Sequence, residues 1–296
     1  MIGKIAQFCK NFLDWFKSDR CFVKYFIDAF SYTNRNFLLL TLVILFVFGV
    51  SMYVMISTVK GANALITLLI VILISSAMAA GFFYSLKKSI DYEQIKIADE
   101  NNMPSTIDTF YSGVGKHYMK FLGVISLFFI LASFLILETF VFANKFVCDI
   151  SKLGIDMRDF FAILADPNNM DIVVNSLSTT QQKYFRDWNR CFLISTQTFT
   201  FLLMFWIPEI LYNKKNIFSS LINSIKKIVT DFPNSLCIYL TILFLNYLVA
   251  VFTVLSGNNG IIVFLLSIFS LYLLVYDFYA IFLYYKARHI DIYERG

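Results

Sequence analysis

Residues 37–59 read FLLLTLVILFVFGVSMYVMISTV, an apolar run without a charged side chain. A transmembrane α-helix needs about 20 such residues, because a helix satisfies its own backbone hydrogen bonds inside the bilayer. Similar runs follow at 63–85, 121–143, 192–212, 236–255 and 261–284. None alternates between apolar and polar residues as the strands of a membrane barrel do. The sequence therefore predicts an all-α polytopic membrane bundle of six transmembrane helices.

The composition is typical of a membrane protein. Hydrophobic residues make up 58% of the chain, the mean hydropathy is +0.69, and only 15% of the residues are charged, whereas soluble domains carry about 25%. The charges fall between the apolar runs, except for Glu138, Glu209 and Asp277. Tyrosines at the ends of the runs, such as Tyr284 and Tyr285, indicate anchors at the level of the lipid headgroups. The alternative is an AT-rich genome, which raises the content of Phe, Ile, Asn, Tyr and Lys together.

Lys and Arg are distributed unevenly, which predicts the orientation. The segments 1–36, 86–120, 213–235 and 286–296 contain 6, 5, 4 and 3 of them, which is 18 of the 25. The other seven lie mostly in or beside the segment 148–190. Because loops rich in Lys and Arg stay on the cytoplasmic side, we expect both termini and both connections in the cytoplasm and 148–190 outside.

A short motif recurs before the first, third and fifth apolar runs. In each copy an isoleucine precedes Asp or Asn and then a small residue: Phe26-Ile27-Asp28-Ala29-Phe30, Thr106-Ile107-Asp108-Thr109-Phe110 and Leu221-Ile222-Asn223-Ser224-Ile225. The recurrence predicts three helix-hairpin repeats, each preceded by an amphipathic interfacial helix. The expected segments are amphipathic regions at 1–36, 86–120 and 213–235, hairpins at 37–85, 121–212 (with the outer loop 148–190) and 236–285, and a tail at 286–296.

Three carboxylates within the apolar runs are the candidate functional residues. An ionisable group at the centre of a bilayer costs about 2.5–3.5 kcal/mol on insertion scales. Asp277 and Glu209 both fall in the inner half of their spans, and Glu138 falls in the outer half. No Lys or Arg within the spans can pair with Asp277, so it needs a tyrosine, a backbone group, water or a proton. For Glu209 the alternative is that it only reaches toward the interface.

Cys148 and Cys191 bracket the outer loop at the ends of the third and fourth runs. On the outer side of a membrane such a pair can oxidise, so the positions predict a Cys148–Cys191 disulfide. The alternative is two unrelated interfacial cysteines.

The side chains that most catalytic and metal sites require are missing. With only His117 and His289, no multi-histidine metal cluster can form. Gly113-Val114-Gly115-Lys116 resembles a fragment of a phosphate loop but lacks its spacing and its Ser or Thr. We therefore expect no enzymatic activity, no metal, no cofactor and no nucleic-acid partner.

The threefold motif and the segment Tyr284-Tyr285-Lys286-Ala287-Arg288 together resemble a group of bacterial six-helix integral membrane proteins. The group includes the membrane domain fused to some glycerophosphodiester phosphodiesterases. The resemblance implies a multi-pass protein of the bacterial inner (plasma) membrane. It carries over no activity, because two histidines cannot supply the phosphodiesterase site.

Two functions follow from these observations. The first is a non-enzymatic integral membrane component that binds partner proteins or lipids, because interfacial segments are many and polar residues in the spans are few. The alternative is a transporter or channel that uses the intramembrane carboxylates, with Ser75-Ser76 and Ser195-Thr196-Gln197-Thr198 lining a path. Membrane lipids, and a protein partner or a second copy of the chain, are the expected partners.

Overall fold

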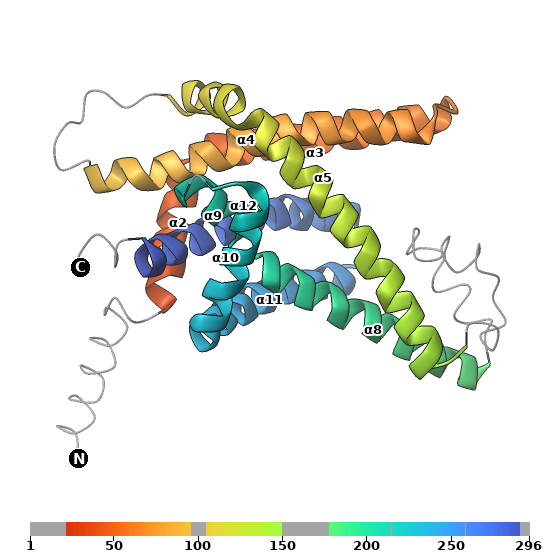
Figure 1. Ribbon diagram of the computed structural model, residues 1–296. Helices are drawn as coiled ribbons and strands as arrows, with labels where there is room; N and C mark the ends of the chain where they lie inside the picture. The colour runs from red at the N-terminus through yellow and green to blue at the C-terminus, as the bar shows by residue number, and fades with distance from the viewer. Residues whose placement is uncertain (1–21, 96–104, 150–177, 214, 258, 291–296) are drawn as a thin grey trace, which may run out of the picture. The chain divides into compact units, whose positions relative to one another are not determined.

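The computed structural model describes residues 22–95, 105–149, 178–213, 215–257 and 259–290. Within these ranges every regular element is a helix, which confirms the predicted all-α class (Figure 1). The elements are α2 (Phe22–Arg35), α3 (Phe37–Val59), α4 (Ala64–Ile95), α5 (Thr106–Phe146), α8 (Thr179–Leu203), α9 (Trp206–Asn213), α10 (Ile217–Thr230), α11 (Phe232–Leu255) and α12 (Gly260–His289). Most of the predicted N-terminal amphipathic segment and of the outer loop 148–190 lies outside the described residues.

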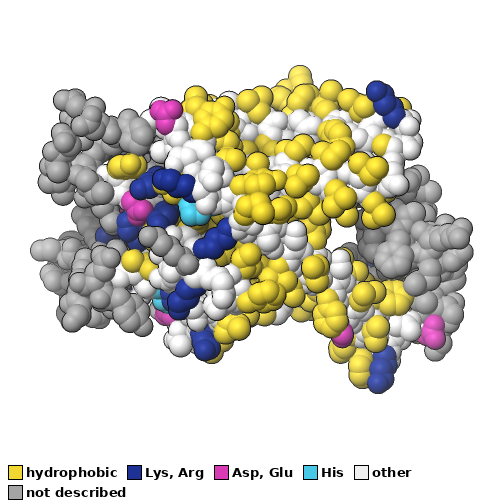
Figure 2. Space-filling model, turned by 45° about the horizontal axis from the view of Figure 1, so that its top comes forward, with side chains coloured by type: hydrophobic (Ala, Val, Ile, Leu, Met, Phe, Trp, Pro, Cys, Tyr) yellow, Lys and Arg dark blue, Asp and Glu magenta, His cyan; other side chains and the backbone are white. Residues whose placement is uncertain are grey.

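Six helices in the described part of the chain are long and apolar enough to cross a membrane. They are α3, α4, α5, α8 together with α9, α11 and α12. Large apolar side chains stay exposed along them, including Leu45, Phe48, Leu69, Phe134 and Phe264, and apolar surface covers much of the face drawn in Figure 2. Exposed apolar surface on this scale suits contact with lipid. The six helices thus indicate a multi-pass membrane protein.

Two helices extend beyond the spans that the sequence predicts for them. Helix α4 runs past residue 85 to Ile95, and α5 runs unbroken from Thr106 to Phe146. The expected break near residue 120, between an interfacial helix and the span 121–143, is absent. Between Thr106 and Phe121 the sequence contains no proline, and glycine alone does not end a helix that packs against a neighbour.

The glycines of the Gly113-Val114-Gly115-Lys116 fragment lie inside α5, so the fragment is not a phosphate loop. A Cβ atom on Gly113 would lie 2.7 Å from Cβ of Tyr84 and 2.8 Å from the carbonyl oxygen of Ala80. On the facing helix, a Cβ atom on Gly81 would lie 2.5 Å from the ring of Phe110. Because glycine has no side chain, Gly81 and Gly113 let α4 and α5 approach each other closely.

The fourth apolar run is broken into two helices. Helix α8 ends at Leu203 and α9 begins at Trp206. Pro208 has no N–H to donate to the carbonyl four residues earlier, and its ring crowds that carbonyl, so a continuous helix is disfavoured here. After the break, the Glu209 N–H donates to the Phe205 carbonyl at 2.9 Å. Glu209 therefore lies on the short helix α9, directly after the break.

The chain forms two compact units. One unit contains the described residues up to Ile125 and those from Leu202 onward, and the other spans Ser126–Phe201. The core of the first unit surrounds the second half of α12, which contacts α2, α3, α4 and α11. Aromatic rings fill this core: Phe83 packs against Phe121, Phe278 and Phe282.

The core of the second unit centres on Trp188, with Ala143 and Phe185. Cys148 and Cys191 both belong to this unit, and the predicted disulfide between them is not present. The side chain that reaches Cys148 from α8 is instead Trp188, whose Nε1 donates to the Cys148 carbonyl at 3.1 Å. The Cys148 thiol donates to the Asp149 carbonyl at 3.3 Å, and Cys191 packs at the edge of the Trp188 cluster.

All three copies of the recurring motif are helical, but their settings differ. The isoleucines at their second position, Ile27, Ile107 and Ile222, are exposed by 62%, 47% and 54%. The first and third copies lie in the separate short helices α2 and α10, whereas the second begins the long helix α5. The threefold repeat and the interfacial role of its helices stay predictions.

Candidate functional site

Glu209 is buried at the meeting point of three helices. Its side chain on α9 is 1% exposed. Oε2 lies 2.7 Å from the Lys227 ammonium on α10 and also accepts a hydrogen bond from the Tyr285 hydroxyl on α12. Oε1 accepts a longer bond, 3.4 Å, from the Asn223 side chain. The Glu209 carboxylate is thus bound by side chains from two other helices, α10 and α12.

Helix α10 presents two of these partners because of its spacing. Asn223 and Lys227 are four residues apart, so they lie on one face of the helix. Asn216 caps this helix, since its side-chain oxygen accepts from the Ser219 N–H at 2.7 Å. On α9 the side chain of Trp206 donates to the Ile217 carbonyl at 3.1 Å, which joins α9 to the start of α10.

The Tyr285 hydroxyl completes the network. It donates to Glu209 and accepts from Lys227 at 2.5 Å and from Asn213 at 3.1 Å. The Lys227 ammonium also lies 4.5 Å from the centre of the Tyr285 ring, a favourable cation–π distance. A buried carboxylate is costly unless it is paired and hydrogen-bonded, and these contacts meet that requirement.

Three successive residues of α12 bind three different elements. Tyr284 donates to Asp231 at the start of α11, Tyr285 donates to Glu209, and the Lys286 ammonium lies 2.7 Å from Asp91 of α4. Successive side chains on a helix point about 100° apart, so one turn can serve three neighbours. Sequence reasoning treated Tyr284 and Tyr285 as interface anchors, yet both are almost fully buried.

An open pocket of about 530 Å³ lies beside this network. Helices α9, α10 and α12, with Lys215 between α9 and α10 and Ile290 just after α12, supply its lining. The lining residues are Glu209, Tyr212, Asn213, Lys215, Asn223, Lys226, Lys227, His289 and Ile290. Three lysines against one glutamate give the lining a formal charge of +2 with His289 neutral. The pocket is suited to an anion rather than to a cation.

His289 forms part of the wall between the pocket and the core. Its ring packs against Phe205, Tyr284 and Tyr285, with ring centroids 5.7, 6.3 and 5.4 Å apart. Its Nε2 is buried and finds no hydrogen-bond partner among the described residues. Sequence reasoning left this histidine without a role.

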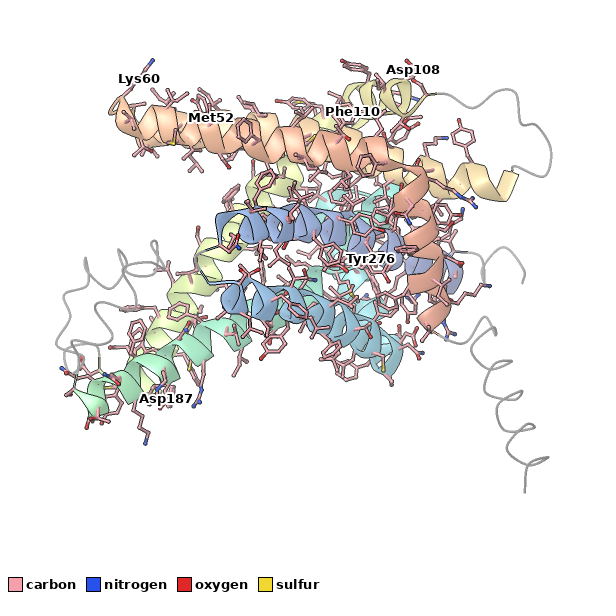
Figure 3. The ribbon with its side chains drawn as sticks, turned by 180° about the vertical axis from the view of Figure 1, so that it is seen from behind. Met52, Lys60, Asp108, Phe110, Asp187 and Tyr276 are labelled. Atoms are coloured by element: carbon pink, nitrogen blue, oxygen red, sulfur yellow. The ribbon has the colours of Figure 1, made fainter. Side chains whose placement is uncertain are left out.

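Asp277 lies in a separate place on α12. It is 6% exposed, and Oδ2 accepts from the Asn246 side chain of α11 at 2.8 Å. Oδ1 is buried and has no hydrogen-bond partner within the part of the chain that the structure describes. Its neighbour Tyr276 (Figure 3) packs against Phe26 of α2, with ring centroids 6.0 Å apart. Sequence reasoning missed Asn246 as the partner of Asp277.

Glu209 and Asp277 lie at separate places within the first unit. Glu209 binds Tyr285, which is eight residues from Asp277 along α12, or roughly 12 Å at 1.5 Å per residue. Glu138 is exposed on α5 in the unit Ser126–Phe201. Next to it, the buried Thr139 shares a 2.6 Å hydrogen bond with Ser195. Glu209 borders the pocket described above.

The buried network of α12 falls on the segment Tyr284-Tyr285-Lys286-Ala287-Arg288 that carried the resemblance to bacterial six-helix membrane proteins. The structure gives this segment a packing role, and the resemblance itself stays a prediction. No protein-family model, no curated protein and no solved structure matches the chain.

Proposed function

We propose that the protein is a non-enzymatic integral membrane component that binds anionic membrane lipids beside α9, α10 and the end of α12. We place it in the bacterial inner membrane, with both termini and this pocket on the cytoplasmic side. The observation that carries the proposal is the open pocket, whose lining has a formal charge of +2 and lies where apolar helices end. Anionic headgroups are attracted to such basic sites at the membrane surface.

The outer surface of α10 supports an interfacial position. Phe218, Ile222 and Val229 are exposed by 65%, 54% and 64%, and Lys226 is exposed on the same helix. The opposite side buries Ser220, Ser224 and Ile228. A helix with exposed apolar and basic side chains binds the boundary between headgroups and acyl chains of an anionic bilayer.

The state of Glu209 argues for a structural role rather than an enzymatic or transport role. Both of its carboxylate oxygens accept hydrogen bonds, and Lys227 balances its charge. A carboxylate that takes part in proton transfer or ion passage has to exchange partners, whereas both oxygens of this one are already bound by side-chain donors.

The proposal is tested by lipid competition. The protein is purified in a mild detergent, mixed with equal amounts of phosphatidylglycerol and phosphatidylcholine of the same acyl chains, and examined by native mass spectrometry. We expect phosphatidylglycerol to be retained preferentially, and the preference to fall as salt is raised, because salt screens exposed charges. Equal retention of the two lipids would overturn the proposal.

The second candidate, a transporter or channel, is favoured by one observation. Asp277 is a buried carboxylate in a candidate span, and its Oδ1 has no hydrogen-bond partner among the described residues. Intramembrane carboxylates of this kind occur on ion and proton pathways. Flux of protons or ions into proteoliposomes that depends on Asp277 would establish this function. Binding of a partner protein or of a second copy of the chain stays a separate prediction.

A further inference from the structure

We infer that the pocket between α9, α10 and the end of α12 binds a phosphate group, which the exposed lysines Lys215 and Lys226 hold. The inference rests on the proposed function and adds to it the site and the chemical group. The same chemistry occurs in a lipid headgroup and in free phosphate, so the experiment has an arm for each.

The three lysines of the lining are not equivalent. Lys227 is bound to Glu209 at 2.7 Å and to the Tyr285 hydroxyl at 2.5 Å, and its side chain is only 20% exposed. Lys215 and Lys226 are exposed and form no ion pair with another residue that the structure describes. These two therefore supply the positive charge that a ligand meets.

The neighbouring groups select for a small, compact anion. Lysine is a mobile point charge that binds phosphate without the fixed fork geometry of arginine. Asn213 and Asn223 lie in the same lining, and their amides supply additional donors for phosphate oxygens. Glu209 also borders the pocket, so the anion is expected at the Lys215 and Lys226 side, away from this carboxylate.

The size and openness of the pocket allow a lipid headgroup to enter. About 530 Å³ is within the usual range of small-molecule sites, and it exceeds what one phosphate fills. The remaining volume can hold the glycerol part of a headgroup, while the exposed Phe218 and Ile222 of α10 lie in the acyl-chain region that we propose beside it.

The test compares a variant that lacks the two exposed lysines of the pocket with a control variant that lacks two exposed lysines elsewhere. The variant Lys215→Gln/Lys226→Gln is compared with Lys60→Gln/Lys145→Gln, which removes two exposed lysines elsewhere. Lys60 lies in the turn between α3 and α4 (Figure 3). Substitutions of exposed lysines leave the fold intact in most proteins, and matching elution profiles and circular dichroism would verify this.

Two titrations are carried out on each protein in detergent: phosphatidylglycerol against phosphatidylcholine by native mass spectrometry, and inorganic phosphate by calorimetry. At about 1 kcal/mol for each lysine near a membrane surface, we expect the apparent Kd for phosphatidylglycerol to rise roughly 30-fold in Lys215→Gln/Lys226→Gln. The Lys60→Gln/Lys145→Gln protein should bind like the wild type.

The outcomes separate the inference from the proposed function. If the wild type prefers phosphatidylglycerol and Lys215→Gln/Lys226→Gln binds this lipid equally well, the proposed phosphate site is wrong, whereas the proposed lipid binding is retained. If inorganic phosphate binds in a manner that requires both lysines but the lipid does not, the phosphate site is right and lipid binding is wrong. If neither ligand binds the wild type, both are overturned.

Discussion

The ammonium of Lys227 lies 2.7 Å from Oε2 of Glu209, and the two side chains come from different helices, α10 and α9. The carboxylate is 1% exposed and the lysine 20% exposed. Because a charge at this depth is tolerated only with its partner, the pair joins the two helices and fixes one wall of the basic pocket. Tyr285 extends the connection to α12.

Removing Lys227 alone should therefore destabilise the protein more than removing both charges. We expect Lys227→Met to lower the free energy of unfolding by about 3 kcal/mol, because it leaves Glu209 buried and unpaired. In Glu209→Gln/Lys227→Met no buried charge remains, so much of the loss should be recovered. Unfolding by denaturant in detergent micelles measures the unfolding free energy of both variants. Equal stability of Lys227→Met and the wild type would show that the pair is not needed.

The contact between α4 and α5 gives a second prediction. Gly113→Ala places a methyl group 2.7 Å from Cβ of Tyr84, and overpacking of this kind costs about 1–3 kcal/mol. Gly115→Ala is the matched control, since a Cβ atom there would meet nothing within 4 Å. The control should be neutral or slightly stabilising, because alanine favours helix over glycine by up to about 1 kcal/mol. Similar stabilities of the two variants would contradict the close approach.

The helices themselves were predictable because each apolar run has to satisfy its backbone in lipid. The residues at which the helices begin and end were harder to predict. The end of a span was expected where hydropathy falls, but α5 begins at Thr106 well before the apolar part of its sequence. A helix can continue into polar sequence as long as its residues suit the helical backbone and pack against a neighbour, as Gly113 does against α4.

The site was only partly predictable. An intramembrane carboxylate requires a partner, so Glu209 and Asp277 could be singled out from the sequence. Lys227 counted only as a basic residue that sets the topology, because nothing local shows that the break before α9 brings Glu209 to α10. Asn246 is uncharged, so nothing in the sequence marked it as the partner of Asp277. Cys148 and Cys191 bracket the outer loop in the sequence, but the side chain that bonds the Cys148 carbonyl is Trp188.

Orientation provides a third prediction. In a cysteine-free background, Lys226→Cys should react with a membrane-impermeant thiol reagent only after the cells are opened, and Lys60→Cys should react in intact cells. Both lysines are exposed, so access to the reagent depends on the side of the membrane rather than on burial. The reverse pattern would place the basic pocket outside and would overturn the orientation drawn from Lys and Arg.

Asp277 gives the last prediction, which distinguishes the two candidate functions. Asn246 is the hydrogen-bond partner of Asp277, at 2.8 Å. Replacing it by leucine should cost about 1–2 kcal/mol, the range of polar contacts between membrane helices. The same replacement should cost little in an Asp277→Leu background, where no carboxylate requires a donor. A double-mutant cycle on the unfolding free energy measures this coupling.

The functional readout uses Asp277→Asn, which keeps an acceptor for Asn246 and removes the ionisable group. If the protein is a lipid-binding component, this variant should bind phosphatidylglycerol like the wild type and be at least as stable, because an ionisable group is costly within a span. If wild-type proteoliposomes carry a proton or ion flux that Asp277→Asn abolishes, the carboxylate lies on a pathway. The protein is then a transporter or channel, and the role of the basic pocket is secondary.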